Sequence, residues 1–191
     1  MNAIGMALLI ALLIFLGIIV FTILMILLIV YISNYNSINK LSIKIDETFS
    51  GIDVALAKRY DLLSQMVAAV KGYMKYEKET LLEVIKIRKG MSLEEKEDAN
   101  KKMDDSSKKI NIVIEKYPEL KADKNVMLLQ KAILDCEEHL QAARRLYNSS
   151  VSQYNQKIVT FPGNMIAKKL NATKKEFFKV EEEKKDYKVE L

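Results

Sequence analysis

The sequence predicts an all-α protein, with an N-terminal transmembrane helix followed by an elongated antiparallel helical bundle. Three observations support this fold class. A stretch of thirty residues near the start is almost entirely apolar, and apolar residues then recur every 3.6 positions in two long runs. The 191 residues also include only two prolines and six glycines, too few for a turn-rich sandwich or barrel.

The charged residues are confined to one part of the chain. Residues 1–39 contain no Lys, Arg, Asp, Glu or His, so all 55 charged side chains lie in the remaining 152 residues. From Ala3 to Ile32 only two glycines and one threonine are not hydrophobic. Thirty helical residues extend about 45 Å, which exceeds the ~30 Å hydrocarbon core of a bilayer. We therefore expect residues 1–33 to form a transmembrane anchor.

A cleaved signal peptide is the competing interpretation of this segment. It requires a basic start, an apolar stretch of about 7–15 residues and a cleavage site with small residues. Here no Lys or Arg precedes the apolar run, which is twice too long, so the segment is expected to remain as an anchor. Lys40 and Lys44 follow it, and the positive-inside rule then predicts a cell membrane protein whose bulk is cytoplasmic.

Residues 34–187 are expected to form the bundle domain, and residues 188–191 a C-terminal tail. The first helix, at about 34–89, carries apolar residues at a mean spacing of 3.6, the period of an α-helix. Gly51 and Gly72 lie inside it, where we expect close helix packing or a bend. The stripe consists of Ile38, Leu41, Ile45, Phe49, Ile52, Leu56, Tyr60, Leu63, Val67, Val70 and Met74.

A second helix is expected at about 92–116. Ser92 and Glu95 have the spacing of a capping box, in which each side chain bonds the other residue's main-chain N–H. Tyr117 precedes Pro118, and a residue before proline is disfavoured in helix, so the helix is expected to end there. Most of its residues are charged, which predicts a largely solvated helix with one apolar edge.

A third helix is expected at about 123–160, with a second long apolar stripe, and Phe161-Pro162-Gly163 is expected to end it. Short C-terminal helices are predicted around 164–170 and 173–187. Short connections favour antiparallel neighbours, so the second helix should fold back on the first and the third should turn again. The stripe of the third helix consists of Val126, Leu129, Ile133, Cys136, Leu140, Ala143, Tyr147, Val151, Tyr154 and Ile158.

Short motifs occur in a fixed order from Tyr35 onward, and in combination they resemble those of the LemA family. The motifs are Tyr35-Asn36, Phe49-Ser50-x-Ile52-Asp53-Val54-x-Leu56, Lys58-Arg59-Tyr60-Asp61-Leu62, Val70-Lys71-Gly72-Tyr73, Glu77-x-Glu79-Thr80-Leu81, Tyr117-Pro118-x-Leu120-Lys121-Ala122, Leu129-Gln130, Ala142-Ala143-Arg144-Arg145-x-Tyr147-Asn148, Tyr154-Asn155 and Phe161-Pro162. The resemblance implies a single-pass membrane protein with a LemA-like helical bundle and no established enzymatic activity. Phe49 and Ser64 stand where the family usually has Trp and Pro, and the loss of that Pro should make the first helix more continuous.

Cys136, Glu138 and His139 are the residues that an enzyme would most plausibly use. Cys136 and His139 are one helical turn apart, and Glu138 and His139 form half of a helical di-metal pattern. The alternative function is therefore a hydrolase or metal-dependent enzyme centred on these three residues. With a single histidine, the second half of such a metal pattern is missing, so we predict no catalytic, cofactor or metal site.

Nine polar residues are embedded among the apolar stripes instead of in the charge runs. On facing helices, Arg and Asn side chains of this kind can form a polar network that sets bundle register, or can bind a partner. These candidate residues are Asp53, Arg59, Asp61, Arg144, Arg145, Tyr147, Asn148, Tyr154 and Asn155.

The predicted function is that of a non-enzymatic scaffold at the membrane. Residues 3–32 are expected to contact the lipid bilayer, and the bundle a protein partner or a second copy of the chain. The net charge of +5 is spread without a basic stripe of interleaved aromatics, so no nucleic-acid partner is predicted. No small-molecule substrate is indicated.

Overall fold

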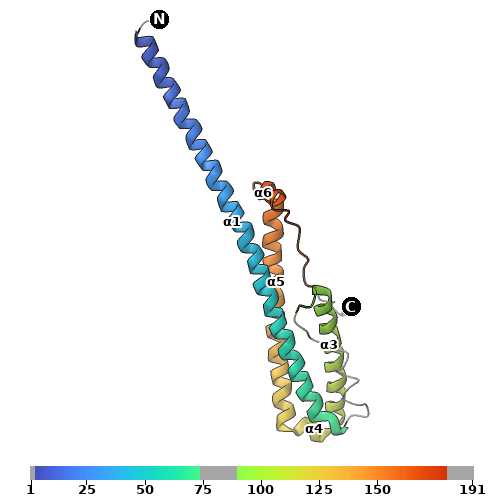
Figure 1. Ribbon diagram of the computed structural model, residues 1–191. Coiled ribbons are helices and arrows are strands. Elements are labelled where there is room, and N and C mark those ends of the chain that lie inside the picture. Colours follow the sequence, from blue (N-terminus) through green and yellow to red (C-terminus); the bar gives the residue numbers. More distant parts are fainter. Residues whose placement is uncertain (1–2, 74–89, 180–191) are drawn as a thin grey trace, which may run out of the picture. The chain divides into compact units, whose positions relative to one another are not determined.

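The computed structural model describes residues 3–73 and 90–179, and all regular secondary structure in this part of the chain is helical (Figure 1). The all-α prediction is therefore confirmed. The elements are α1 (Ala3–Val70), a 3-10 turn (Lys71–Tyr73), α3 (Leu93–Lys116), α4 (Pro118–Ala122), α5 (Lys124–Val159) and α6 (Gly163–Lys169).

The chain divides into two compact units. Unit 1 comprises Met1–Lys44 and Ser152–Lys175, and unit 2 comprises Ile45–Val151 and Glu176–Leu191. Both α1 and α5 contribute residues to each unit. Unit 2 also contains α3 and α4, and unit 1 contains α6.

Within unit 2, α3 runs parallel to α1. The carboxylate of Asp53 pairs with Lys96, and further along both helices the ring of Tyr73 packs on that of Tyr117. Because residue numbers rise together along the two elements, the expectation that the second helix folds back on the first is wrong. The antiparallel rule applies to short connections, but α1 ends at Val70, well before α3 begins at Leu93.

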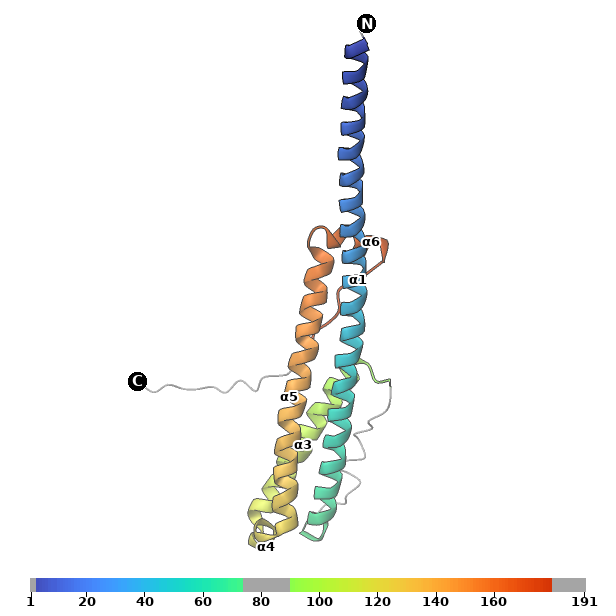
Figure 2. The same cartoon turned by 90° about the vertical axis from the view of Figure 1, so that its left-hand side faces the viewer.

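In unit 2, α5 runs antiparallel to α1 (Figure 2). Phe49 packs on Tyr147, and Arg59, ten positions later, pairs with Glu137, ten positions earlier. Because α3 runs parallel to α1, α5 is antiparallel to α3, as expected, but its direction relative to α1 is the opposite of that expected for an up-down-up order. Its bounds, Lys124–Val159, agree with the predicted range of about 123–160.

The predicted apolar stripes form the core of unit 2. Their residues meet those of one edge of α3, and each fully buried aliphatic side chain stabilises the fold by about 1.5–3 kcal/mol. The buried set includes Ile45, Ile52, Leu56, Leu63, Val67 and Val70 from α1, Ala99, Met103, Ile110 and Ile114 from α3, and Val126, Ile133, Cys136, Leu140, Tyr147 and Val151 from α5.

The start of α3 follows the predicted capping box. The main-chain N–H of Glu95 donates to Ser92 Oγ at 3.2 Å, and that of Ser92 donates to Glu95 Oε2 at 2.8 Å. At the other end, Tyr117 has an extended backbone (φ −118°, ψ 105°) before Pro118. Both ends of the second predicted helix are therefore confirmed. The short helix α4, which begins at Pro118, was not predicted.

Unit 1 contains the apolar length of α1. Every residue from Ala11 to Ile32 is exposed, and a stretch of α1 is long and apolar enough to cross a membrane, with a mean hydropathy of 3.4. α6, at Gly163–Lys169, confirms the short helix predicted around residues 164–170.

Two predicted helical segments differ from the structure. α1 remains α-helical only to Val70, and residues 74–89 of the first predicted helix lie outside the described residues. In the segment predicted as a helix around 173–187, residues 173–179 form no helix, and the remainder also lies outside the described part. The physical reason is that side chains of α5 bind the main chain of this segment, as described below.

Candidate functional site

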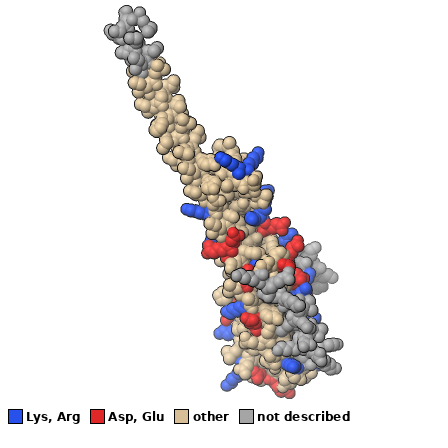
Figure 3. All heavy atoms as spheres, in the orientation of Figure 1, with Lys and Arg blue, Asp and Glu red and all other residues tan. Residues whose placement is uncertain are grey.

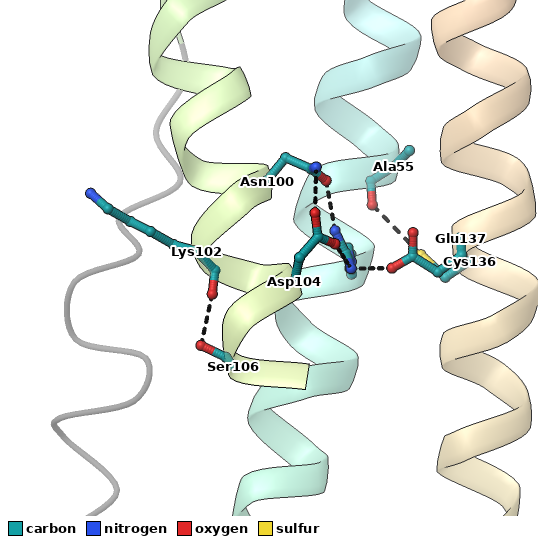
Figure 4. Close-up of polar contacts among 8 residues, drawn as sticks. Ala55, Asn100, Lys102, Asp104, Ser106, Cys136 and Glu137 are labelled. Atoms are coloured by element: carbon teal, nitrogen blue, oxygen red, sulfur yellow. Dashed lines mark hydrogen bonds and ion pairs between the residues drawn. The ribbon is translucent and has the colours of Figure 1, made fainter. Parts of the chain in front are cut away.

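The most elaborate polar cluster in unit 2 surrounds the guanidinium of Arg59, which α1 places among three helices (Figure 4). The Arg59 side chain is only 2% exposed. Its Nη1 donates to Asn100 Oδ1 at 2.6 Å and its Nη2 to Asp104 Oδ1 at 2.5 Å, both on α3. Nη2 also pairs with Glu137 Oε1 on α5. One arginine therefore joins α1, α3 and α5 through charge-assisted hydrogen bonds.

The remaining contacts of this cluster orient its members. Asn100 Nδ2 donates to Asp104 Oδ2 at 3.1 Å, so both oxygens of that carboxylate accept hydrogen bonds. Burial raises the pKa of Glu137, and the nearby Arg59 acts in the opposite direction with a smaller effect. We call Arg59, Asn100, Asp104 and Glu137 the Arg59 network.

A second buried cation lies in unit 2, one turn before Asn100 on α3. Lys96 is 1% exposed, and its Nζ lies 2.6 Å from Asp53 Oδ1 and 3.1 Å from the centroid of the Phe49 ring. The ring of Phe49 also packs on Tyr147 at a centroid distance of 5.4 Å. The ammonium is therefore held by a carboxylate and an aromatic face, both of which come from α1.

In unit 2, side chains of α5 bind the main chain of the extended C-terminal segment. Asn148 Nδ2 donates to the Phe178 carbonyl at 3.0 Å, and the Phe178 N–H donates to Asn148 Oδ1 at 2.8 Å. The hydroxyl of Tyr147 donates to the Glu176 carbonyl at 3.1 Å, and burial raises the pKa of Tyr147, which favours the protonated donor. These bonds satisfy main-chain groups that a helix would otherwise pair internally.

In unit 1, Asn155 makes the same kind of contact as Asn148. Asn155 Nδ2 donates to the Lys175 carbonyl at 2.8 Å, and the Lys175 N–H donates to Asn155 Oδ1 at 2.9 Å. Each of the two asparagines thus binds both main-chain groups of one residue. We call them the Asn148 clamp and the Asn155 clamp.

The packing, the network and the clamps lie within residues that match a known family. The model of the LemA family matches residues 48–191, about three quarters of the chain. The chain belongs to the LemA family. It is also similar to Protein LemA of Metamycoplasma hominis, with 29% identity over 147 residues that cover 74% of this chain and 67% of that protein.

This LemA family protein uses the nine predicted polar residues in different ways. Arg59 and Asp53 enter the two cation clusters, and Tyr147, Asn148 and Asn155 bind the C-terminal segment. Arg144 is 7% exposed, and its guanidinium carbon lies 5.0 Å from the centroid of the Phe178 ring. Tyr154 is buried, whereas Asp61 and Arg145 are exposed.

The partners of these residues on α3 and α5 were not predicted. Asn100, Asp104 and Glu137 were not among the candidate residues, and Lys96 lies on the helix that was predicted to be largely solvated. A signal was present for two of them, because Lys96 and Asn100 precede the buried Met103 at helical spacing and so share the inner face of α3.

The residues of the enzymatic alternative do not form a common site in the LemA bundle. Cys136 is buried and its thiol donates to the Ala55 carbonyl at 3.7 Å, whereas Glu138 and His139 are exposed. Burial raises the pKa of Cys136, which disfavours the nucleophilic thiolate. Among the described residues, no group of three or more His, Cys, Asp or Glu side chains could hold a metal ion.

Proposed function

We propose that the protein is a non-enzymatic, single-pass membrane protein that presents its LemA bundle for protein–protein interaction or self-assembly at the cell membrane, with membrane organisation as the process served. The observation that carries this proposal is the exposed, uncharged length of α1 from Ala11 to Ile32. An apolar helix of this length is stabilised by transfer from water into a bilayer.

The continuity of α1 supports a direct connection between membrane and bundle. The same helix extends from Ala3 to Val70 without a break. A proline at position 64, which the family usually has, would favour a break there. Ser64 instead donates from its hydroxyl to the Tyr60 carbonyl at 2.8 Å within the helix. Lys40 and Lys44 follow the apolar length, and by the positive-inside rule they favour a cytoplasmic bundle.

The use of charge in unit 2 supports a scaffold. Arg59 pairs with Glu137, and Lys96 pairs with Asp53, so these charges hold helices together. Large apolar side chains nevertheless remain at the surface of unit 2 and offer contact area to a protein partner or a second copy. They include Val54, Ile112, Met127, Leu128, Leu134 and Leu146.

Two measurements on the full-length protein test this proposal. It should remain in the membrane fraction after alkaline carbonate extraction, and release into the soluble fraction would refute the anchor. Its mass in detergent, together with chemical crosslinking in native membranes, should reveal a defined oligomer or a crosslinked partner. A monomer without crosslinked products in native membranes would refute the interaction role.

A further inference from the structure

The basic excess of the protein lies entirely in unit 1. The two stretches of this unit contain seven lysines and no Asp, Glu or Arg, a net charge of +7, while the whole chain has +5. The residues of unit 2 therefore sum to −2. The seven lysines are Lys40, Lys44, Lys157, Lys168, Lys169, Lys174 and Lys175.

The corner between α5 and α6 exposes large apolar side chains in this basic unit. Val159 is 51% exposed, Phe161 79% and Met165 64%. On the inner side of α6, Ile166 is 5% exposed and Ala167 3%, so the short helix is fixed in place by its own buried face. We call Val159, Phe161 and Met165 the apolar corner.

The glycine at the start of α6 makes this corner tight. A β-carbon at Gly163 would collide with the main-chain carbonyl of Lys157 on the last turn of α5. The chain can therefore reverse here only with glycine at this position. The close turn displays Phe161 at its outer edge, where the side chain is more exposed than any other large apolar residue described.

In unit 1, α6 lies beside the end of the apolar length of α1. Lys169 Nζ lies 5.4 Å from the centroid of the Tyr31 ring, which stacks on Tyr35 at 6.4 Å. Tyr31 is the last residue but one of the apolar stretch that ends at Ile32. Figure 3 shows basic side chains, drawn in blue, next to the uncharged length of this helix. Tyrosines and lysines are typical of the interfacial layer where a membrane helix leaves the bilayer.

We propose that the apolar corner is a second membrane contact, in which Phe161 and Met165 enter the interfacial layer while Lys168 and Lys169 approach anionic lipid headgroups. The inference rests on the proposed function, because the anchor brings unit 1 to the bilayer. Three features favour a lipid surface: the absence of acidic residues from the unit, the exposed apolar side chains between its lysines, and the adjacent end of the apolar helix. A nucleic-acid partner would be favoured only by the first feature, the absence of acidic residues.

The chain contains no tryptophan, so single tryptophan variants can report lipid contact at chosen positions. Phe161→Trp tests the corner, Phe21→Trp tests the apolar length of α1, and Leu128→Trp is an exposed control in unit 2. Each full-length variant is reconstituted in vesicles that contain brominated phospholipid, and the loss of tryptophan fluorescence is measured. We expect strong quenching for F21W, quenching near that level for F161W, and little for L128W.

The three variants separate the two proposals. If F21W is not quenched, the membrane anchor itself is refuted. If F21W is quenched but F161W behaves like L128W, the anchor stands and the second contact is overturned. Circular dichroism of each variant verifies that its helix content matches that of the parent protein, so that only folded variants are compared.

A charge-neutralised pair tests the lipid class. In the F161W protein, Lys168→Gln and Lys169→Gln remove two lysines of unit 1, and Lys109→Gln with Lys131→Gln removes two exposed lysines of unit 2 as a matched control. Quenching of F161W should increase as anionic phosphatidylglycerol replaces phosphatidylcholine, and the first pair should abolish most of that increase while the control pair keeps it. Equal quenching in both lipids, or equal loss in both pairs, would overturn the role of the lysines.

Discussion

Units 1 and 2 share two long helices, yet they use charge in opposite ways. Unit 2 buries three cations, Arg59, Lys96 and Arg144, and holds the first two against carboxylates from neighbouring helices. Unit 1 contains seven lysines and no acidic residue. Paired charges in unit 2 connect helices, whereas the lysines of unit 1 are the groups that we propose approach anionic lipid.

The pairing in unit 2 also specifies how its helices align. A shift of one helix by a single turn moves a side chain by about 5.4 Å, more than a hydrogen bond can tolerate. Arg59 must meet Asn100, Asp104 and Glu137 together, so a shift of α1, α3 or α5 would leave charge buried without a partner. We therefore propose that the Arg59 network sets the alignment of these three helices.

The largest effect is expected from removal of Arg59. Arg59→Ala leaves Glu137 and Asp104 without their cation, and loss of one partner from a buried pair costs about 3–5 kcal/mol. We expect the lower end of this range, because Asp104 is 43% exposed and water screens its charge. The measurement is urea unfolding of the full-length protein in detergent, followed by circular dichroism.

Arg145→Ala provides the matched control. Arg145 is exposed on α5, so its loss should change the free energy of unfolding by no more than about 0.5 kcal/mol. If R59A and R145A destabilise the protein equally, the network does not stabilise unit 2 and its role in helix alignment fails.

The two clamps allow the same substitution to be compared between the units. Asn148→Ala removes two part-buried hydrogen bonds to Phe178 in unit 2 and should destabilise the protein by about 1–3 kcal/mol. Asn155→Ala removes two exposed bonds to Lys175 in unit 1, where water replaces the lost partner, so it should cost less than about 1 kcal/mol. Urea unfolding gives both values.

Hydrogen exchange then locates each effect. N148A should expose the Phe178 amide to exchange and N155A the Lys175 amide, because each clamp accepts from that one main-chain N–H. Rapid exchange of both amides in the parent protein would contradict the clamps, since an amide bound by a side-chain oxygen should be protected.

The helices were predictable because their signals are local. The stripe from Ile38 onward on α1 and that from Val126 onward on α5 have the α-helical period, and Ser92 with Glu95 marks the start of α3. The direction of α3 was not predictable in this way, because it depends on which residues meet across helices. The contact between Asp53 and Lys96 leaves no trace in local periodicity.

The same reasoning explains the error in the C-terminal segment. Residues 173–179 belong to the charged segment around 173–187 for which a short helix was predicted. The Asn148 and Asn155 side chains instead bind the main chain of this segment, and both asparagines lie at least twenty positions away in sequence. Asn148 and Asn155 were among the candidate residues, but the sequence does not show what they bind.

The stability of unit 2 should depend on pH through the protonation of Glu137. Burial raises its pKa above the ordinary value of 4.5 for a glutamate, so the native state binds this proton more tightly than the unfolded state does. The associated stabilisation is fully present below pH 4.5 and is lost as pH rises through the raised pKa. Glu137→Gln removes this dependence, so the stability of the parent relative to E137Q should fall from acidic pH toward neutrality.

Glu138→Gln is the control, because Glu138 is exposed and adjacent in sequence. Urea midpoints of the three proteins across this pH range provide the test. A rise in the relative stability of the parent with pH would show that attraction by Arg59 outweighs burial at Glu137, and would contradict this prediction.

The smallest effect on stability is expected from the substitution of one glycine in each unit, Gly51 and Gly163. Close packing or a bend was expected at Gly51, but α1 continues through it and a β-carbon there would meet nothing within 4 Å. Gly51→Ala should therefore stabilise unit 2 by about 0.5–1 kcal/mol, because alanine loses less conformational entropy in a helix. Gly163→Ala should destabilise unit 1, since its β-carbon would meet the Lys157 carbonyl. If both variants shift the urea midpoint in the same direction, the tight corner that displays Phe161 does not depend on glycine.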